Sequence, residues 1–343
     1  MALQAFRDEL ASTAAALAAP GTGLLAADES TGTIGKRFDA IGLENSEENR
    51  RAYRSLLATT PGLSDHISGV ILFEETLFQD STKEAGGTPI TELFQAQGIV
   101  PGIKVDEGVE PLAGGARYYE QGARFAKWRT VLQISANGSP SELSVRENAW
   151  GLARYARTVQ EQGLVPIVEP EILMDGDHDI TTTAAVQEWV LRTTYEALAV
   201  NGVFLEGSLL KPSMTCAGAS CSQQPSAEEV GEFTVRTLMR TVPSAVPSIL
   251  FLSGGLSEED ASLCLNAINQ VAARCGAPWH LGFSYGRALQ HSCIKNWAGK
   301  DLKAGQAALL ARARANGTAS LGRYVPGSEP SDDSSLFVAN YSY

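Results

Sequence analysis

Eight short apolar segments recur along the chain, and segments with helical spacing of apolar residues separate them. The apolar segments are Gly23–Asp28, Ser68–Phe73, Ile99–Val105, Arg124–Ile134, Leu164–Glu169, Val203–Lys211, Pro247–Ser253 and Trp279–Tyr285. Helical patterns occupy Ser46–Thr59, Ser144–Gln162, Thr181–Val200, Ser226–Val242 and Ser257–Cys275. Strands that alternate with helices predict βαβ units and a parallel sheet. Eight such units in 343 residues predict a single α/β domain, a closed (β/α)8 barrel.

The two ends of the chain depart from this alternation. Near the start, Phe6, Leu10 and Leu17 can share one helical stripe that docks onto the barrel. We therefore expect one domain over residues 1–326, the N-terminal helix included. Residues 327–343 are rich in Ser, Asp and Gly and predict a flexible C-terminal tail that ends in Tyr343.

Composition and charge narrow the class of protein. The apolar fraction is 44% and the charged fraction 19%, which is typical of a globular protein in water. The net charge of −12 and the lack of any basic run argue against nucleic acid as a partner. No apolar run is long enough to span a membrane, and the early charged residues 7–9 argue against a signal peptide. Five irregularly spaced cysteines suit the reducing cytoplasm.

Charged and polar residues stand where the predicted strands end. In barrels of this kind, functional residues lie at the C-terminal ends of the strands, so side chains at these positions converge on one mouth. An acidic protein that binds an anionic substrate must gather its few cations in one place. The strand ends carry Asp28, Lys104, Lys127, Arg129, Glu169, Glu171, Lys211, Ser253, Gly254 and Arg287.

Lys211 ends an apolar segment and is the candidate nucleophile. Apolar surroundings and nearby cations disfavour the charged form of an amine. A neutral amine can attack a ketone or aldehyde and form a Schiff base. The alternative is that the Lys211 side chain extends to the surface where the strand meets a loop.

Two further strands place charges of opposite sign on one face. Side chains alternate across a strand, so Lys127 and Arg129 share a face, as do Glu169 and Glu171. Such charges can compensate one another around a polar substrate. A salt-bridged plug of the barrel without catalytic function is the alternative.

The last two strands end in residues suited to phosphate. Exposed backbone amides at Ser253 and Gly254, beside a helix start, form an anion site, and Arg287 after the next strand can bind a phosphate through two nitrogens. An ordinary loop at this place is the alternative. Asp28, after the first strand, can hold a hydroxyl group or the Lys211 amine, or cap the following helix.

A metal site is a further alternative at the same mouth. The carboxylates of Asp28, Asp106, Glu169 and Glu206 are ligands that suit Mg²⁺, but lysines nearby would repel a dication. The histidines 66, 178, 280 and 291 have no zinc-binding spacing. We therefore expect no metal.

The chain closely resembles class I fructose-bisphosphate aldolases over nearly its whole length, the terminal tyrosine included. Two of the matching stretches, GLVPIVEPEIL and ARFAKWRTV, are most similar to plant and algal members, whereas SYGRAL resembles the cytosolic type. The full set of matching stretches is LLAADESTGTIGKR, ENSEENRRAYR, SGVILFEETL, GIVPGIKVDEG, GARFAKWRTVL, LVPIVEPEILMDGDHDI, LEGSLLKPSM, LFLSGGLSEEDA and FSYGRALQ.

The resemblance implies a function and a role for each catalytic residue. The reaction would be reversible, cofactor-free and metal-free cleavage of fructose 1,6-bisphosphate to dihydroxyacetone phosphate and glyceraldehyde 3-phosphate, in glycolysis and gluconeogenesis. Lys211 would form the imine at the C2 ketone. Glu169 would be the acid/base, supported by Glu171. Asp28 and Lys127 would line the bond that breaks.

The resemblance also implies substrate contacts, partners and location. Tyr343 would mediate proton exchange on the enamine. A homotetramer in the cytoplasm would be typical, or a plastid protein if a transit peptide was removed. The residues that would hold the substrate, chiefly its phosphates, are Arg37, Lys104, Arg129, Ser253, Gly254, Gly255, Ser284, Gly286 and Arg287.

Two segments depart from the family pattern. After Gly108 the chain reaches Gly114 directly, so the segment 109–116 is shorter than in typical members by about a dozen residues, in a region where loop lengths vary. This puts the tetramer in doubt. Residues 214–218 also differ from the usual run after the lysine. Two alternatives remain open, namely another lysine-imine barrel lyase and an inactive scaffold that binds sugar phosphates.

Overall fold

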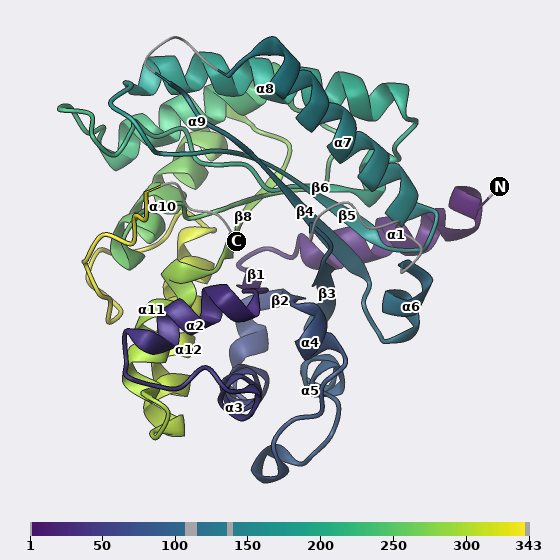
Figure 1. Cartoon of the computed structure of the whole chain (residues 1–343). Coiled ribbons are helices and arrows are strands. Elements are labelled where there is room, and N and C mark those ends of the chain that lie inside the picture. The colour runs from purple at the N-terminus through teal and green to yellow at the C-terminus, as the bar shows by residue number, and fades with distance from the viewer. Residues whose placement is uncertain (1, 107–114, 136–139, 340–343) are drawn as a thin grey trace.

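Eight parallel strands close into a barrel in their sequence order (Figure 1) in the computed structural model, which describes residues 2–106, 115–135 and 140–339. The last strand pairs back onto the first, with Leu24 beside Ser284 and Leu25 beside Tyr285. The predicted (β/α)8 barrel is therefore confirmed. The strands are β1 Gly23–Ala27, β2 Ile67–Leu72, β3 Val100–Lys104, β4 Phe125–Leu132, β5 Val165–Ile172, β6 Leu209–Leu210, β7 Ser248–Phe251 and β8 His280–Tyr285.

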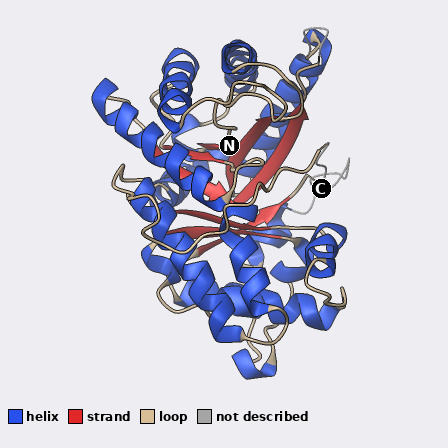
Figure 2. Ribbon diagram, turned by 90° about the vertical axis from the view of Figure 1, so that its left-hand side faces the viewer, coloured by secondary structure: helices blue, strands red, loops and turns tan. Residues whose placement is uncertain are grey.

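Helices surround the strands on the outside (Figure 2). The five predicted helices begin within two residues of the expected positions, because polar side chains cap them; Ser226 and Glu229 form a reciprocal capping box. None of the described helices is both long and apolar enough to cross a membrane. The helices are α1 Ala2–Leu17, α2 Thr31–Asp39, α3 Glu47–Ala58, α4 Glu74–Leu77, α5 Ile90–Ala96, α6 Gly115–Glu120, α7 Glu142–Gln160, α8 Ile180–Val200, α9 Ala227–Thr241, α10 Glu258–Cys275, α11 Arg287–Trp297 and α12 Leu302–Ala319, with 3-10 turns η1 Leu63–Asp65, η2 Lys83–Ala85 and η4 Leu205–Gly207.

The N-terminal helix α1 closes the end of the barrel at which the strands begin. Leu10 and Leu17 are fully buried among barrel-lining side chains such as Leu24 and Phe125, while Phe6 is partly buried. Gly69 of β2 permits this contact, since a Cβ there would lie 2.6 Å from a methyl group of Leu17. The predicted docking stripe is confirmed. Closure at this end leaves the C-terminal ends of the strands as the open mouth.

The sixth strand is much shorter than its apolar sequence predicts. Residues 203–208 turn through η4, and only Leu209–Leu210 form β6. Gln160 binds the carbonyl oxygens of Phe204 and Gly207, and Gly207 lies so close to α1 that a Cβ would be 2.8 Å from the Leu10 Cβ. These contacts hold the backbone in a turn. Lys211 follows directly, with its N–H donated to the Val168 carbonyl at 2.8 Å.

Strand β5 continues past Glu169, where it was predicted to end, to Ile172. Pro170 does not stop it, although proline lacks the N–H of a strand residue. Val168 and Ile172 form their hydrogen bonds on the β6 side, with Lys211 and Ser213. Pro170 faces the same side because strand residues alternate, and β6 has already ended there. Glu169 and Glu171 therefore both lie within a regular strand.

The segment after α12 returns to the barrel mouth. The Tyr324 hydroxyl donates to Glu259, the Asp332 N–H donates to Glu258, and the Leu336 N–H donates to the Gly255 carbonyl at 3.2 Å. In Figure 1 this yellow segment lies beside α10. The described part of the predicted tail is thus in contact with the body, and its flexibility stays a prediction.

Candidate active site

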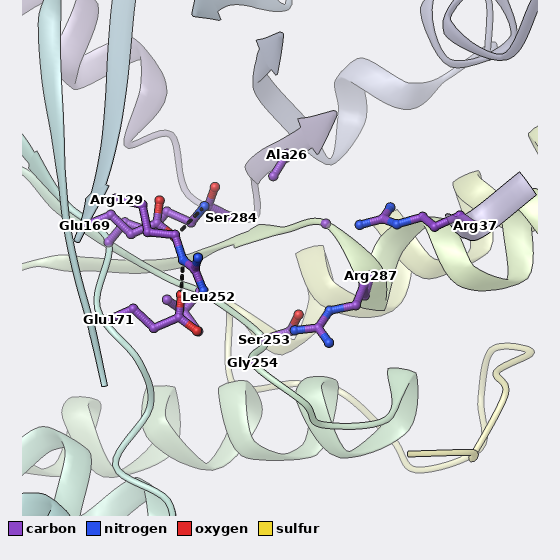
Figure 3. Close-up of a pocket in the computed structure, with 12 residues that line it drawn as sticks. Ala26, Arg37, Arg129, Glu169, Glu171, Leu252, Ser253, Gly254, Ser284 and Arg287 are labelled. Atoms are coloured by element: carbon purple, nitrogen blue, oxygen red, sulfur yellow. Dashed lines mark hydrogen bonds and ion pairs between the residues drawn. The ribbon is translucent and has the colours of Figure 1, made fainter. Parts of the chain in front are cut away.

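A pocket opens at the C-terminal ends of the strands, and ten of the predicted site residues line it. Figure 3 shows Arg37 and Arg287 approaching from one side, with Glu169, Glu171 and Arg129 on the other. The structure thus brings together residues from sequence positions 26 to 287. The lining residues are Ala26, Arg37, Arg129, Glu169, Glu171, Lys211, Leu252, Ser253, Gly254, Ser284, Gly286 and Arg287.

Lys211 and Glu169 form a buried pair inside this pocket. The Lys211 Nζ lies 3.1 Å from the Glu169 Oε1, and the two side chains are 2% and 1% exposed. The alternative in which Lys211 extends to the surface is therefore wrong. Burial raises the pKa of the Glu169 carboxyl, and Lys211 and Lys127 offset that rise only in part. Glu169 consequently holds a proton at higher pH than an ordinary glutamate, as an acid/base beside an amine requires.

Lys127 is fully buried at the centre of a cluster of carboxylates. Its Nζ lies 3.0 Å from Asp28, 2.9 Å from Asp106 and 3.6 Å from Glu169. Burial alone would raise the pKa of Asp28, but the charges of Lys127 and Lys211 outweigh burial and hold that pKa well below its usual range. Asp28 is therefore an anion at neutral pH.

Asp28 does not cap the following helix. The N-cap of α2 is Ser30, whose hydroxyl accepts the N–H of Thr33. The capping alternative for Asp28 is wrong, because this carboxylate points to Lys127 instead.

Arg129 and Glu171 make a second buried ion pair. The Arg129 Nε lies 2.5 Å from the Glu171 Oε2, and the Arg129 backbone N–H donates to Asp106. Lys127 and Arg129 lie on one face of β4, and Glu169 and Glu171 lie on one face of β5, as the alternation of side chains predicts. Each anion thus compensates a cation from the neighbouring strand.

The loop after β7 forms the end of the pocket suited to phosphate. Gly254 has a φ of +56°, a left-handed conformation that favours glycine, and the Gly255 N–H points to the Met174 sulfur at 3.4 Å. Across the pocket, the buried Ser284 hydroxyl has no hydrogen-bond partner within the described ranges and suits a ligand oxygen. Backbone amides, a hydroxyl and guanidinium groups are together donors that bind a phosphate dianion.

Arg287 already contacts the C-terminal segment. Its Nη1 donates to the Leu336 carbonyl at 2.5 Å. Gly255 packs against Phe337 of the same segment, since a Cβ there would lie 2.8 Å from the Phe337 Cβ. Gly255 is not among the residues that line the pocket. Tyr343 lies outside the described residues.

Two acidic residues of the site were not predicted as catalytic or substrate-binding. The Asp106 carboxylate lies between two lysines, 3.5 Å from the Lys104 Nζ and 2.9 Å from the Lys127 Nζ. Its position two residues after Lys104 indicates the same face, and this spacing could have identified it. Glu29 is buried against Arg37, eight residues away on α2, and against Arg54 on α3, and no local pattern indicates those contacts.

Several expectations concern residues away from this pocket. Glu206, one of the candidate Mg²⁺ ligands, is exposed in η4 because the sixth strand is short. Across residues 2–106, 115–135 and 140–339, no group of three or more His, Cys, Asp or Glu side chains could hold a metal ion. Most of the shortened segment 109–116 lies outside the described residues, as does the segment 136–139.

Comparison with known proteins gives one family. A family model described as fructose-bisphosphate aldolase class-I matches residues 9–343. A cytosolic fructose-bisphosphate aldolase of Arabidopsis thaliana is 52% identical, covering 98% of both chains. A chloroplastic one of rice is 52% identical over 358 positions, covering 99% of this chain and 90% of the rice chain. That alignment is longer than this chain of 343 residues, so the relative has positions that are missing here.

A solved structure agrees with these relatives. The fructose-bisphosphate aldolase of Plasmodium falciparum, crystallised in complex with TRAP and a small-molecule inhibitor, matches with a TM-score of 0.89 and 51% identity. The match covers 93% of this chain and 96% of that chain.

Proposed function

This chain belongs to the class I fructose-bisphosphate aldolase family, whose members cleave fructose 1,6-bisphosphate reversibly, and we propose that Lys211 carries out this cleavage through a Schiff base. The observation that supports the role of Lys211 is its burial at the barrel mouth, 3.1 Å from Glu169. A buried amine beside a carboxyl whose pKa burial raises is suited to imine formation and to the proton transfers that it requires.

The reaction begins at the C2 ketone of the substrate. The Lys211 amine attacks the carbonyl carbon, and the carbinolamine loses water to form a protonated imine. Glu169 supplies the proton that leaves with the hydroxyl as water. The 3.1 Å separation of the two side chains places Glu169 beside the nitrogen at which the carbinolamine forms and loses water.

Carbon–carbon cleavage follows. A carboxylate removes the proton of the C4 hydroxyl, the C3–C4 bond breaks, and its electron pair enters the imine to form an enamine. Glyceraldehyde 3-phosphate leaves with the new aldehyde. Protonation at C3 and hydrolysis of the imine then release dihydroxyacetone phosphate. We assign Glu169, with support from Glu171, to these transfers, Asp28 and Lys127 to the surroundings of the breaking bond, and Tyr343 to protonation of the enamine.

The cations of the site bind the substrate phosphates in this proposal. Arg37 and Arg287 approach the pocket from one side (Figure 3), and Ser253 and Gly254 line it just after β7. Two phosphates explain why the cations occur in separated groups, since Arg37 and Arg287 lie on one side of the pocket and Arg129 lies on the other. Lys104, Arg129, Gly255, Ser284 and Gly286 complete the binding set that we propose.

Borohydride trapping tests the imine. Protein reduced with sodium borohydride in the presence of dihydroxyacetone phosphate should carry a stable secondary amine at Lys211, located by peptide mapping. Lys211→Met should give no adduct and no cleavage, while Lys303→Met, which alters an exposed lysine of α12, should behave as wild type. A folded wild-type protein without an adduct would instead support the alternative of an inactive scaffold.

We further propose a homotetramer in the cytoplasm. The relatives include cytosolic and chloroplastic aldolases, so location within the cell rests on the cytosolic similarity of the SYGRAL stretch. Light scattering should give a mass about four times 36.4 kDa. A monomeric mass would indicate that the shortened segment after Gly108 has removed a subunit contact.

A further inference from the structure

Glu29 is a buried carboxylate between the first strand and α2 that the reaction itself does not use. It lies between Asp28 and the helix cap Ser30, and its side chain is 1% exposed. Three side chains from three helices surround its carboxylate. Arg37 of α2 lies 2.5 Å away, Arg54 of α3 lies 2.8 Å away, and Gln290 of α11 donates a hydrogen bond of 2.9 Å.

The charge of Glu29 is maintained by these arginines. Burial alone would raise its pKa, but Arg37 and Arg54 outweigh burial and lower the pKa below its ordinary value of 4.5. Glu29 is therefore an anion at neutral pH. Gln290, which binds the Glu29 carboxylate, is itself held in place, because it also donates to the Ala26 carbonyl and accepts from the Tyr53 hydroxyl.

Of the two arginines, Arg37 reaches the pocket and Arg54 does not. Arg37 lines the pocket together with Arg287, and its Nη2 lies 3.8 Å from the place that a Cβ on Gly286 would take. Figure 3 shows the Arg37 side chain extending toward the pocket from the same side as Arg287. Arg54 is buried beneath it, with 4% of its side chain exposed.

We propose that Glu29 is a positioning residue that orients the Arg37 guanidinium for a phosphate group of the substrate. This inference rests on the proposed function of Arg37. An arginine side chain has many rotamers, and restricting it to one of them when substrate binds costs free energy. A contact that already restricts the side chain in the free protein lowers this cost of binding. A carboxylate on one guanidinium nitrogen leaves the planar group in a set orientation toward the pocket. The residue binds no substrate itself.

The test is steady-state kinetics of Glu29→Gln with fructose 1,6-bisphosphate. We expect KM to rise about tenfold and kcat to change less than twofold, since a misplaced binding group weakens the substrate complex without touching the reacting atoms. Arg37→Ala should raise KM at least as much, and the double variant should add little to Arg37→Ala, because Glu29 acts through Arg37. Glu75→Gln is the matched control. It breaks a partly buried ion pair with Arg50, neither residue of which lines the pocket, and should leave KM unchanged.

The outcomes distinguish the proposed role of Arg37 from the proposed role of Glu29. If Arg37→Ala leaves KM unchanged, the proposed role of Arg37 in phosphate binding is wrong. If Arg37→Ala raises KM but Glu29→Gln does not, the function stands and the inference about Glu29 is overturned. If Glu29→Gln does not fold, Gln290→Met, which removes one hydrogen bond to Glu29 with little change in volume, should raise KM by a smaller factor. An unchanged KM in folded Gln290→Met, or a drop in kcat alone, would also overturn the inference.

Discussion

Each buried lysine or arginine at the centre of the site lies beside at least one carboxylate, so a change at one residue alters the charge around its neighbours. Lys127 has three carboxylates within 3.6 Å, and Arg129 has Glu171. An isolated buried charge is strongly destabilising, whereas such sets are tolerated when every member is paired. Replacement of one carboxylate therefore changes the proton affinity of the others, and Glu169, the proposed acid/base group, should report that change.

The pH dependence of activity should follow Glu169. Its pKa lies above the ordinary 4.5 because of burial, so the acid limb of the kcat profile should lie above pH 4.5. Glu171→Gln removes a negative charge that raises this pKa and releases Arg129, which lowers it. The limb should then move to lower pH. Profiles of kcat over pH 4 to 9 for both proteins check this, and a limb that moves upward would contradict the assignment.

Residue identity in the site could be predicted where strand geometry determines it. Lys127, Arg129, Glu169 and Glu171 follow from the alternation of side chains. The partners of these residues could not be predicted. Asp106 follows β3, for example, whereas Lys127, which it contacts, lies on β4. Local sequence carries no information on such a contact.

At the scale of elements, α1 shows how a segment outside the βα repeat supports the site. It fills the end of the barrel where strands begin, with Leu10 and Leu17 fully buried. Its contact with Gly207 lies in the turn just before Lys211. The helix therefore supports the turn that precedes Lys211, the proposed nucleophile, from the end of the barrel opposite the mouth.

Leu10→Ala should reduce stability much more than it alters substrate binding. The side chain is fully buried, and loss of a buried leucine in a packed core costs about 2–5 kcal/mol. Urea denaturation measures the loss. Leu143→Ala, at a leucine of α7 that is 71% exposed, is the control and should change stability by less than about 0.5 kcal/mol. Equal effects of the two changes would refute the closing role of α1.

Elements were predicted best where helix caps and strand alternation mark them. Ser46, Ser226 and Ser257 mark helix starts that the structure contains. The length of β6 was not predictable, because η4 is held by Gln160 of α7 and by α1. An apolar segment indicates burial, and tertiary contacts determine whether it is extended.

At the scale of the whole molecule, the site is cationic within an acidic protein. The net charge of the protein is −12, yet four cations (Arg37, Arg129, Lys211 and Arg287) and only two carboxylates (Glu169 and Glu171) line the pocket. A local positive potential in a partly enclosed pocket attracts a bisphosphate, while the remaining surface repels it. Binding of the substrate should therefore depend on ionic strength.

KM for fructose 1,6-bisphosphate should rise several-fold between 0.05 M and 0.5 M NaCl. Added salt shortens the distance over which charges interact to about 4–5 Å, so the attraction between the pocket and the phosphates weakens. The kcat value should change much less, because buried ion pairs such as Lys127–Asp28 are screened little. Steady-state assays at constant pH, with a neutral osmolyte as control, measure both. A salt effect confined to kcat would contradict the proposed binding set.

The chain by itself determined the barrel, its order of strands and the open end at which charged residues gather, because short-range periodicity and the geometry of parallel strands decide these. Only the tertiary structure decided which charges pair, how far β6 extends and that Glu29 joins Arg37 to Arg54. Those features depend on atoms that different strands and helices bring within a few ångströms of one another, and the closing of the barrel sets those distances.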